Sequence, residues 1–155
     1  MILRRLNPVD LAAFQAYRQD PEVGKYQDWT RMDDAKAFGF LRHMAEAELF
    51  ERGQWSQIGI DLDGVLIGDM GVFLSAEASE AEVGVTLARE AQGKGLGAAA
   101  VSALFDYLFE AFGLERIIAG ADKHNVRSIA LMERLGMTFT GAANGDVDYV
   151  VKRPN

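Results

Sequence analysis

The sequence predicts an α/β fold in which a single mixed sheet carries helices on both faces. Apolar residues recur at helical spacing in residues 7–52, at strand spacing in residues 54–88, and alternate between the two periods thereafter. Antiparallel hairpin strands followed by a strand–helix–strand unit are typical of a mixed sheet. We expect the order β-α-α-β-β-β-α-β-α-β-β in one domain, residues 1–155, because no linker or low-complexity segment divides the chain.

The N-terminal third predicts a short strand at residues 2–6 and two helices. Asn7 and Pro8 are typical of a helix start, and this helix should run to about Asp20 and stop before Pro21. Residues 30–33 repeat a start signal with the spacing of a capping box. The second helix should continue to about residue 49, with Gly53 beyond its end.

The middle of the chain predicts three strands. Residues 54–62 and 65–74 are strand-like and are joined by Asp63-Gly64, a strong hairpin signal. A polar connection leads to a strand at residues 81–88, whose apolar residues share one face: Ala81, Val83, Val85 and Leu87.

The C-terminal half predicts two more helices and three strands. The helices are residues 96–112, ended by Gly113, and 125–135, closed by Gly136. The strands are residues 117–121, 137–140 and 147–152, and residues 141–145 should form the loop between the last two.

Composition narrows the classes of function. The formal net charge of −7 argues against a nucleic-acid partner, which usually requires a basic face. No apolar run is long enough for a membrane helix, and Arg4-Arg5 interrupts what would be a signal peptide's apolar region. The absence of cysteine excludes disulfides and thiolate metal sites. We therefore expect a cytoplasmic protein without membrane or nucleic-acid partners, and a monomer or homodimer.

Gln92-Gly93-Lys94-Gly95-Leu96-Gly97 is the most informative segment. It lies between a strand and an alanine-rich helix, and its three alternating glycines permit positive φ angles and close approach of a ligand. Free N–H groups and the helix dipole favour an anion at such a helix start. The segment therefore predicts a phosphate-binding loop, although a turn that serves only tight packing is the simpler alternative.

Two other phosphate ligands are less consistent with this segment. The GxxxxGK[ST] pattern of nucleoside-triphosphate sites is absent. Residues 95–100 match the GxGxxA dinucleotide fingerprint, and Asp122 ends the next strand. However, residues 89–92 separate the strand from the first glycine, and a single further strand–helix unit is too little for a doubly wound sheet.

The sequence resembles the GNAT N-acetyltransferases, whose cofactor motif is [QR]-x-x-G-x-[GA]. Residues 92–97 match that motif in full, and residues 82–97 look most like the branch that acetylates the N-termini of ribosomal proteins. Asn125-Val126-Arg127-Ser128 and Glu133-Arg134-Leu135-Gly136-Met137 are similar to that branch's N-x-x-S…E-x-x-G-F, with Met137 in place of the usual phenylalanine. The likeness extends to Leu3-Arg4-Arg5-Leu6 and Asp20-Pro21-Glu22-Val23 and so covers most of the chain.

The resemblance implies acetyl-CoA as the co-substrate and direct transfer to an amine, with no metal. The pyrophosphate would bind the amides of Gln92, Gly93, Lys94, Gly95, Leu96 and Gly97, and the pantetheine arm would pair with the backbone near Val85 and Leu87. The strands at 81–88 and 117–121 would diverge to admit the arm. Asn125 would contact it.

The resemblance also implies the catalytic residues. Glu82 matches the family's glutamate and is the candidate base, with Glu80 on the same face as a weaker substitute. An ordinary glutamate pKa is too low to deprotonate an ammonium efficiently, so Glu82 needs burial, an intervening water, or a role only in binding the amine. Ser128 matches the serine that hydrogen-bonds the CoA sulfur and protonates it. Capping and solvent exposure are the simpler explanations for these residues.

The remaining candidates have weaker signals. His43 and His124 are isolated, have no metal-ligand spacing, and are expected at the surface. The resemblance implies that the first two helices shape the acceptor site, which makes candidates of Tyr26, Trp29, Phe38, Phe40, Asp28, Asp33 and Asp34. The expected function is N-acetylation of a protein N-terminus or a small amine. A CoA-binding regulatory domain without turnover, or a dinucleotide-binding module, are the alternatives.

Overall fold

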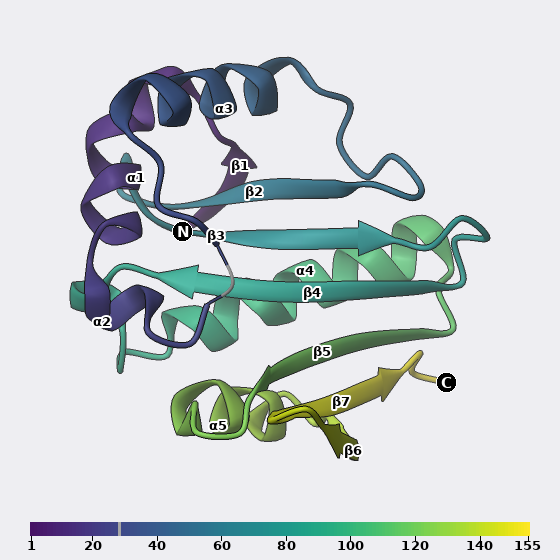
Figure 1. Ribbon diagram of the computed structural model, residues 1–155. Coiled ribbons are helices and arrows are strands. Elements are labelled where there is room, and N and C mark those ends of the chain that lie inside the picture. The colour runs from purple at the N-terminus through teal and green to yellow at the C-terminus, as the bar shows by residue number, and fades with distance from the viewer. Residues whose placement is uncertain (28) are drawn as a thin grey trace.

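The computed structural model describes residues 1–27 and 29–155 and contains one mixed sheet with helices on both faces (Figure 1). Within these residues, the sheet has seven strands in the order β1-β2-β3-β4-β5-β7-β6. The strands are β1 (Ile2–Arg5), β2 (Trp55–Leu62), β3 (Val65–Leu74), β4 (Glu80–Leu87), β5 (Arg116–Asp122), β6 (Thr138–Ala143) and β7 (Asp146–Lys152). The α-helices are α1 (Leu11–Arg18), α2 (Pro21–Gly24), α3 (Asp34–Glu46), α4 (Leu96–Phe112) and α5 (Val126–Arg134).

Strand pairing is antiparallel except between β4 and β5. These two strands pair in parallel over only three residue pairs. The pairs are Glu80 with Arg116, Ala81 with Ile117 and Glu82 with Ile118. Beyond Glu82, β4 remains paired with β3 up to Leu87, but its other edge separates from β5. Divergence of these two strands is what the sequence resemblance implies.

Two apolar clusters lie on opposite faces of the sheet. One contains α4, Met132 of α5 and the inward side chains of β3, β4 and β5. The other contains side chains of α1 and α3 with Leu6 and Leu66. Figure 1 shows α4 running behind β3 and β4, whereas α1 and α3 lie beside β1 and β2. The predicted shared face of Ala81, Val83, Val85 and Leu87 is confirmed, since all four belong to the α4 cluster.

The N-terminal helices differ from the prediction in their bounds. Asn7 caps a 3-10 turn at Pro8–Asp10, and α1 then ends at Arg18. Helix α2 was not predicted; its start is capped by Asp20, and Pro21 occupies its first position. The prediction of a start at Thr30 was also wrong, because Asp33 caps α3 and accepts a hydrogen bond from the Lys36 N–H. The end of α3 at Glu46 leaves Leu49 outside the helix.

The second half agrees closely with the prediction, and β3 and α4 have the predicted bounds. The prediction of a loop at residues 141–145 was wrong, because residues up to Ala143 belong to β6. The turn consists of Asn144 and Gly145, both with positive φ, as in a two-residue hairpin. Across residues 1–27 and 29–155, no helix combines the length and apolarity needed to span a bilayer.

A buried polar network fixes α1 on the sheet. Asp69 of β3 is 1% exposed and accepts hydrogen bonds from the Tyr17 hydroxyl, the Arg18 guanidinium at 2.6 Å and the Gln57 amide at 2.8 Å. Burial and the adjacent Asp69 raise the pKa of Tyr17 far above its usual value, so the phenol stays protonated and donates. The Arg18 guanidinium also lies 4.1 Å from the Trp29 ring centroid, which ties the segment after α2 to α1.

Replacing Asp69 by alanine should lower the free energy of unfolding by about 3–5 kcal/mol, because it leaves the Arg18 charge buried without its partner. Urea denaturation measures this change. Asp106→Ala is the matched control, since Asp106 is exposed on α4 and its loss should change stability by less than about 0.5 kcal/mol. Equal effects of the two substitutions would contradict the role given to Asp69.

Candidate active site

A large groove lies between the start of α4, the segment around α2, and α5. Its volume is about 1240 Å³, which is above the roughly 300–1,000 Å³ of typical small-ligand sites and therefore suits a long ligand. It is lined by most of the residues that the sequence predicts for the cofactor: Val85, Leu87, Gln92, Gly93, Lys94, Gly95, Gly97, Asn125 and Ser128. Leu96, also predicted, does not line it.

The glycine loop has the backbone that its sequence predicts. Gly93 and Gly95 have φ angles of +76° and +78°, which residues with a Cβ adopt only with strain. Both positions face open space, so a ligand can approach the backbone closely there. The Gln92 side chain donates a hydrogen bond to the Leu87 carbonyl at 3.1 Å and closes the turn between β4 and α4.

The first turn of α4 presents unused hydrogen-bond donors. Gly95 is the N-cap of α4, and no side chain in the described part of the chain caps it. Gly97 is buried, and a Cβ at this position would lie 3.1 Å from the Leu87 side chain, so the glycine allows α4 to pack tightly on β4. The amides at the start of α4 therefore border the groove and are suited to an anion.

Cationic side chains line the groove of this acidic protein. Lys25, Arg89, Lys94, Arg127 and Arg134 border it, whereas Glu22 is the one carboxylate among the described lining residues. The Arg89 guanidinium donates to the Asp20 carboxylate, and this hydrogen bond lowers the pKa of the Asp20 carboxyl. The remaining cations line the groove, where they favour a polyanionic ligand.

The groove continues into the gap between β4 and β5. A smaller cavity of about 90 Å³ is lined by residues of both strands, including Val83, Val85, Ala119 and Ala121. The two cavities share six lining residues and so meet at a common junction: Tyr26, Gln27, Val85, Asn125, Ser128 and Leu131. One continuous path therefore leads from the glycine loop to the strand gap.

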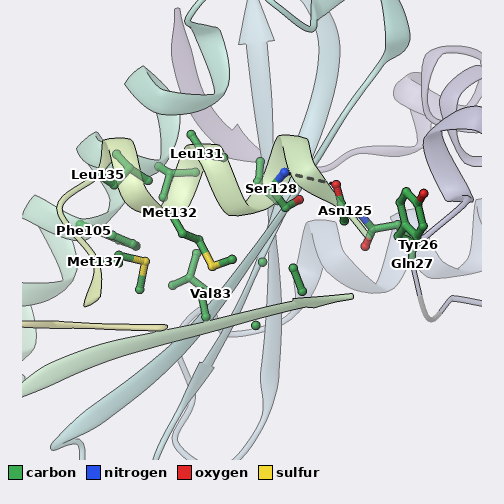
Figure 2. Close-up of a pocket in the computed structure, with 16 residues that line it drawn as sticks. Tyr26, Gln27, Val83, Phe105, Asn125, Ser128, Leu131, Met132, Leu135 and Met137 are labelled. Carbon is green, nitrogen blue, oxygen red and sulfur yellow. Dashed lines mark hydrogen bonds between the residues drawn. The ribbon is translucent and has the colours of Figure 1, made fainter. Parts of the chain in front are cut away.

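Asn125 and Ser128 lie together at this junction (Figure 2). The Asn125 side chain accepts a hydrogen bond from the Ser128 N–H at 3.2 Å, so Asn125 is the N-cap of α5. Capping α5 is the simpler of the two roles predicted for Asn125. It is compatible with a cofactor contact, because Asn125 and Ser128 also line the path from the glycine loop to the strand gap. The half-buried Ser128 hydroxyl remains available to a ligand there.

Glu82 lies where β4 and β5 stop pairing, on the face of β4 opposite Val83. Burial raises the pKa of the Glu82 carboxyl above its ordinary value, and the charges of Asp148 and Glu80 raise it further. The Glu80 carboxylate forms an ion pair with the Arg116 guanidinium, which makes Glu80 a less suitable base than Glu82. Glu82 lines neither of the two cavities described above, and its carboxylate faces the other side of the sheet.

The predicted acceptor residues separate into different environments. Tyr26 lines both cavities, whereas Trp29 packs on Arg18 and Phe40 stacks on Phe14 at 5.7 Å. Phe38 is exposed on α3. The carboxylate of Asp33 caps α3 and that of Asp34 accepts from Gln15; Asp28 lies outside the described residues.

Both histidines lie at the surface, as the sequence predicts. His43 is exposed on α3, and the exposed His124 borders the groove. No cluster of metal-binding side chains occurs in residues 1–27 and 29–155. Sequence reasoning missed Lys25, Gln27, Arg127 and Arg134. Residues 127, 131 and 134 recur at helical spacing, and this pattern could have indicated one face of α5.

The chain was compared with known proteins. Residues 1–138 match the family described as the acetyltransferase (GNAT) domain. An uncharacterized N-acetyltransferase, p20, of Bacillus licheniformis is 30% identical over 143 residues, which cover 91% of this chain and 80% of the relative. Two solved structures share the fold. The ribosomal L7/L12 alpha-N-protein acetyltransferase RimL in complex with coenzyme A has a TM-score of 0.81 and 18% identity, over 97% of this chain and 92% of RimL. The aminoglycoside acetyltransferase AAC(6')-Ib in complex with coenzyme A has a TM-score of 0.80 and 20% identity, over 97% of this chain and 94% of that protein.

The matched family covers nearly the whole chain, and both solved acetyltransferase structures share the fold of the chain. The family that residues 92–97 and 125–137 resemble is therefore confirmed. The chain belongs to the GNAT acetyltransferase family and is an N-acetyltransferase.

Proposed function

We propose that this enzyme transfers an acetyl group from acetyl-CoA directly to a primary amine. One observation carries the proposal: the cation-lined groove runs from the glycine loop to the gap between β4 and β5, where Ser128 lies. Such a path fits a long polyanionic donor whose reactive end must reach the middle of the sheet. Glu82 is the last residue of β4 that pairs with β5, and its side chain points to the face of β4 opposite Val83.

The donor's pyrophosphate is held by the backbone amides of Gln92 to Gly97, and all of these residues except Leu96 line the groove. Each hydrogen bond to a charged oxygen contributes roughly 1.5–3 kcal/mol, so several of them bind the group without a dedicated lysine. Lys25, Arg127 and Arg134 add charge along the same groove. Coenzyme A also binds the related enzymes RimL and AAC(6')-Ib, which supports this choice of donor.

The pantetheine arm lies along the open edge of β4. Past Glu82 this edge no longer pairs with β5, so the backbone groups near Val85 and Leu87 can bind the arm as an added strand would. Asn125 and Ser128 approach the arm from α5 at the junction of the two cavities. This arrangement brings the thioester to the level of Val83 and Ser128.

The reaction is a direct acyl transfer. The amine nitrogen attacks the thioester carbonyl carbon, a C–N bond forms, and the C–S bond breaks. The amine loses a proton, which Glu82 takes directly or through one water, and the departing thiolate gains a proton from Ser128. The raised pKa of Glu82 makes it a stronger base than an exposed glutamate, and positioning of both substrates supplies most of the rate.

The acceptor approaches from the face of β4 that carries Glu82. Asp148 of β7 lies near Glu82 and adds a second carboxylate, so this face favours a cationic amine. A protein N-terminus is the first candidate, by analogy with RimL, and a small amine such as an aminoglycoside or polyamine is the second, by analogy with AAC(6')-Ib. A CoA-binding regulatory domain would bind the donor and acetylate neither class.

Acetyl-CoA and CoA should raise the melting temperature of the protein, whereas NAD and ATP should not. Ligand at 100 times its Kd adds about 2.7 kcal/mol, enough for a shift of a few degrees in a chain of this size. Gly95→Ala should reduce the shift, because Gly95 has a φ of +78° beside the phosphate. Gly64→Ala is the matched control: φ is +88° in the β2–β3 turn, so it lowers stability without changing the response to CoA. Stabilisation by NAD alone would refute the donor assignment.

Ser128→Ala should lower kcat by about 10²-fold while leaving the Kd of CoA nearly unchanged, because the hydroxyl acts on the departing sulfur. Turnover is measured with whichever acceptor reacts in a screen of N-terminal peptides and small polyamines. Ser102→Ala, on the exposed face of α4, should retain the activity of the unsubstituted enzyme. Full activity of the Ser128 variant would exclude this role.

Glu82→Gln should lower kcat/KM by about 10²-fold and remove the acid limb of its pH profile. A base must be ionised, so the rate rises with pH through the pKa of Glu82, which lies above the ordinary 4.5. Asp148→Asn removes a neighbouring negative charge and should move the same limb to lower pH. An acid limb that persists in the Glu82 variant would assign it to another group.

A further inference from the structure

Two aromatic side chains lie in line with Glu82 on its face of the sheet. Phe73 of β3 is paired directly with Glu82 of β4, and Trp55 of β2 is paired directly with Phe73. Directly paired residues of antiparallel strands project from the same face, so the three side chains form one row. The two rings pack with their centroids 5.5 Å apart, and Trp55 is 52% exposed. Because adjacent strands lie about 4.8 Å apart, this apolar surface lies about 5–10 Å from Glu82.

The next row on the same face has glycines on β3 and β4. Gly71 is paired with Gly84, two residues along the strands from Phe73 and Glu82. Gly84 is exposed, and a Cβ there would meet no atom within 4 Å, so the space over it is open. A Cβ at Gly71 would lie 3.4 Å from two atoms of the Trp55 ring, so this ring covers the neighbouring glycine. The aromatic row therefore borders an open area of backbone beside Glu82.

A second carboxylate lies on the other side of this open area. Asp148 of β7 is paired with Gly120 of β5, and its Oδ1 atom would lie 3.1 Å from a Cβ at Gly120. The charge of Asp148 also acts on Glu82. Gly84 and Gly120 line the smaller cavity in the strand gap, so the open area adjoins the proposed position of the donor's thioester. An acceptor over Gly84 thus has carboxylates toward β7 and aromatic rings toward β2.

This asymmetry suits amines of one chemical class. The ammonium group is attracted to the carboxylates of Glu82 and Asp148. An apolar group on the same molecule is buried favourably against the rings of Trp55 and Phe73. A polyamine would place its second ammonium at the aromatic end, where Phe73 and Gly71 offer no charge.

We propose that the Trp55–Phe73 pair selects the acceptor, and that the acceptor is a primary amine with an aromatic or large aliphatic group within a few bonds of its nitrogen. The inference rests on the proposed function, because it requires Glu82 to mark the position of the reacting amine. A peptide that begins with phenylalanine or leucine has this chemistry, and so does an arylalkylamine. The transfer step is the same for both: the nitrogen gains the acyl carbon and loses its proton.

Initial-rate kinetics of the intact enzyme with saturating acetyl-CoA tests the inference, with the released CoA thiol as the readout. Peptides that differ only in their first residue (glycine, alanine, leucine or phenylalanine) form one series, and ethylamine, phenethylamine and spermidine form another. kcat/KM should rise about tenfold from alanine to phenylalanine and from ethylamine to phenethylamine, because the added group is partly buried on the rings. Reaction in one series alone identifies the source of the amine, and the preference is then measured within that series.

Two other outcomes of these kinetics would count against different claims. Equal rates within a series, or a preference for glycine-first peptides or spermidine, would overturn the inference and leave the proposed function intact. Acetylation of no amine by protein that binds CoA would instead overturn the proposed function, and the inference with it.

Substitution of Trp55 shows whether the rings cause the preference. Trp55→Ala should reduce the preference for phenylalanine over alanine to about twofold, and Trp55→Phe should restore most of it. Because Trp55 lines neither cavity of the donor path, both variants should bind CoA with the Kd of the unsubstituted protein.

Phe139→Ala is the matched control for Trp55→Ala. Phe139 is 54% exposed on β6, and its ring packs on Tyr149 at 5.8 Å between centroids. Tyr149 belongs to the α4 cluster, so this aromatic pair lies on the other face of the sheet and its loss should leave the preference unchanged. A full preference in Trp55→Ala, or an equal loss in Phe139→Ala, would overturn the assignment.

Discussion

The parallel pairing of β4 and β5 ends at Glu82 and Ile118, and the rest of the site depends on this end. An open strand edge inside a sheet leaves backbone groups unsatisfied, and these groups require either water or a ligand that pairs as a strand does. The glycine loop lies at one end of that edge and the last paired residues lie at the other. Under the proposed function, the length of β4 beyond Glu82 therefore fixes the distance between the donor's phosphates and the reacting carbon.

Two distinct requirements meet around this edge. The polyanionic end of the donor needs positive charge in a protein of net charge −7, and α5 and the segment around α2 supply it locally. The reacting end needs a dry environment, and three residues of the cluster that packs α4 on β4 line the smaller cavity: Val83, Val101 and Phe105. The buried Asp69 network holds α1 on the other face and, through Arg18 and Trp29, the segment that borders the groove.

Local signals predicted the parts of the fold that depend on local chemistry. Asp63-Gly64 indicated the β2–β3 turn, and Gly95 and Gly113 bounded α4 because both require positive φ. The helix α2 was missed because four residues give no periodicity, although Asp20 and Pro21 were a start signal. Contacts between distant residues could not be read from one sequence: Asp69 lies about fifty positions from Tyr17 and Arg18, and Asp148 lies 66 positions from Glu82. The cations of α5 were missed because the groove they face exists only in the folded chain.

Successive residues of a strand point to opposite faces, so the side chains of Glu82 and Val83 lie on different sides of the sheet although they are neighbours in the chain. A substitution at Ala119 or Met132 reshapes the cavity on one face and leaves the carboxylates on the other face unchanged. Under the proposed function, the donor site and the acceptor site can therefore change independently in evolution. A gene duplicate of this enzyme could acquire a new acceptor without first losing its thioester.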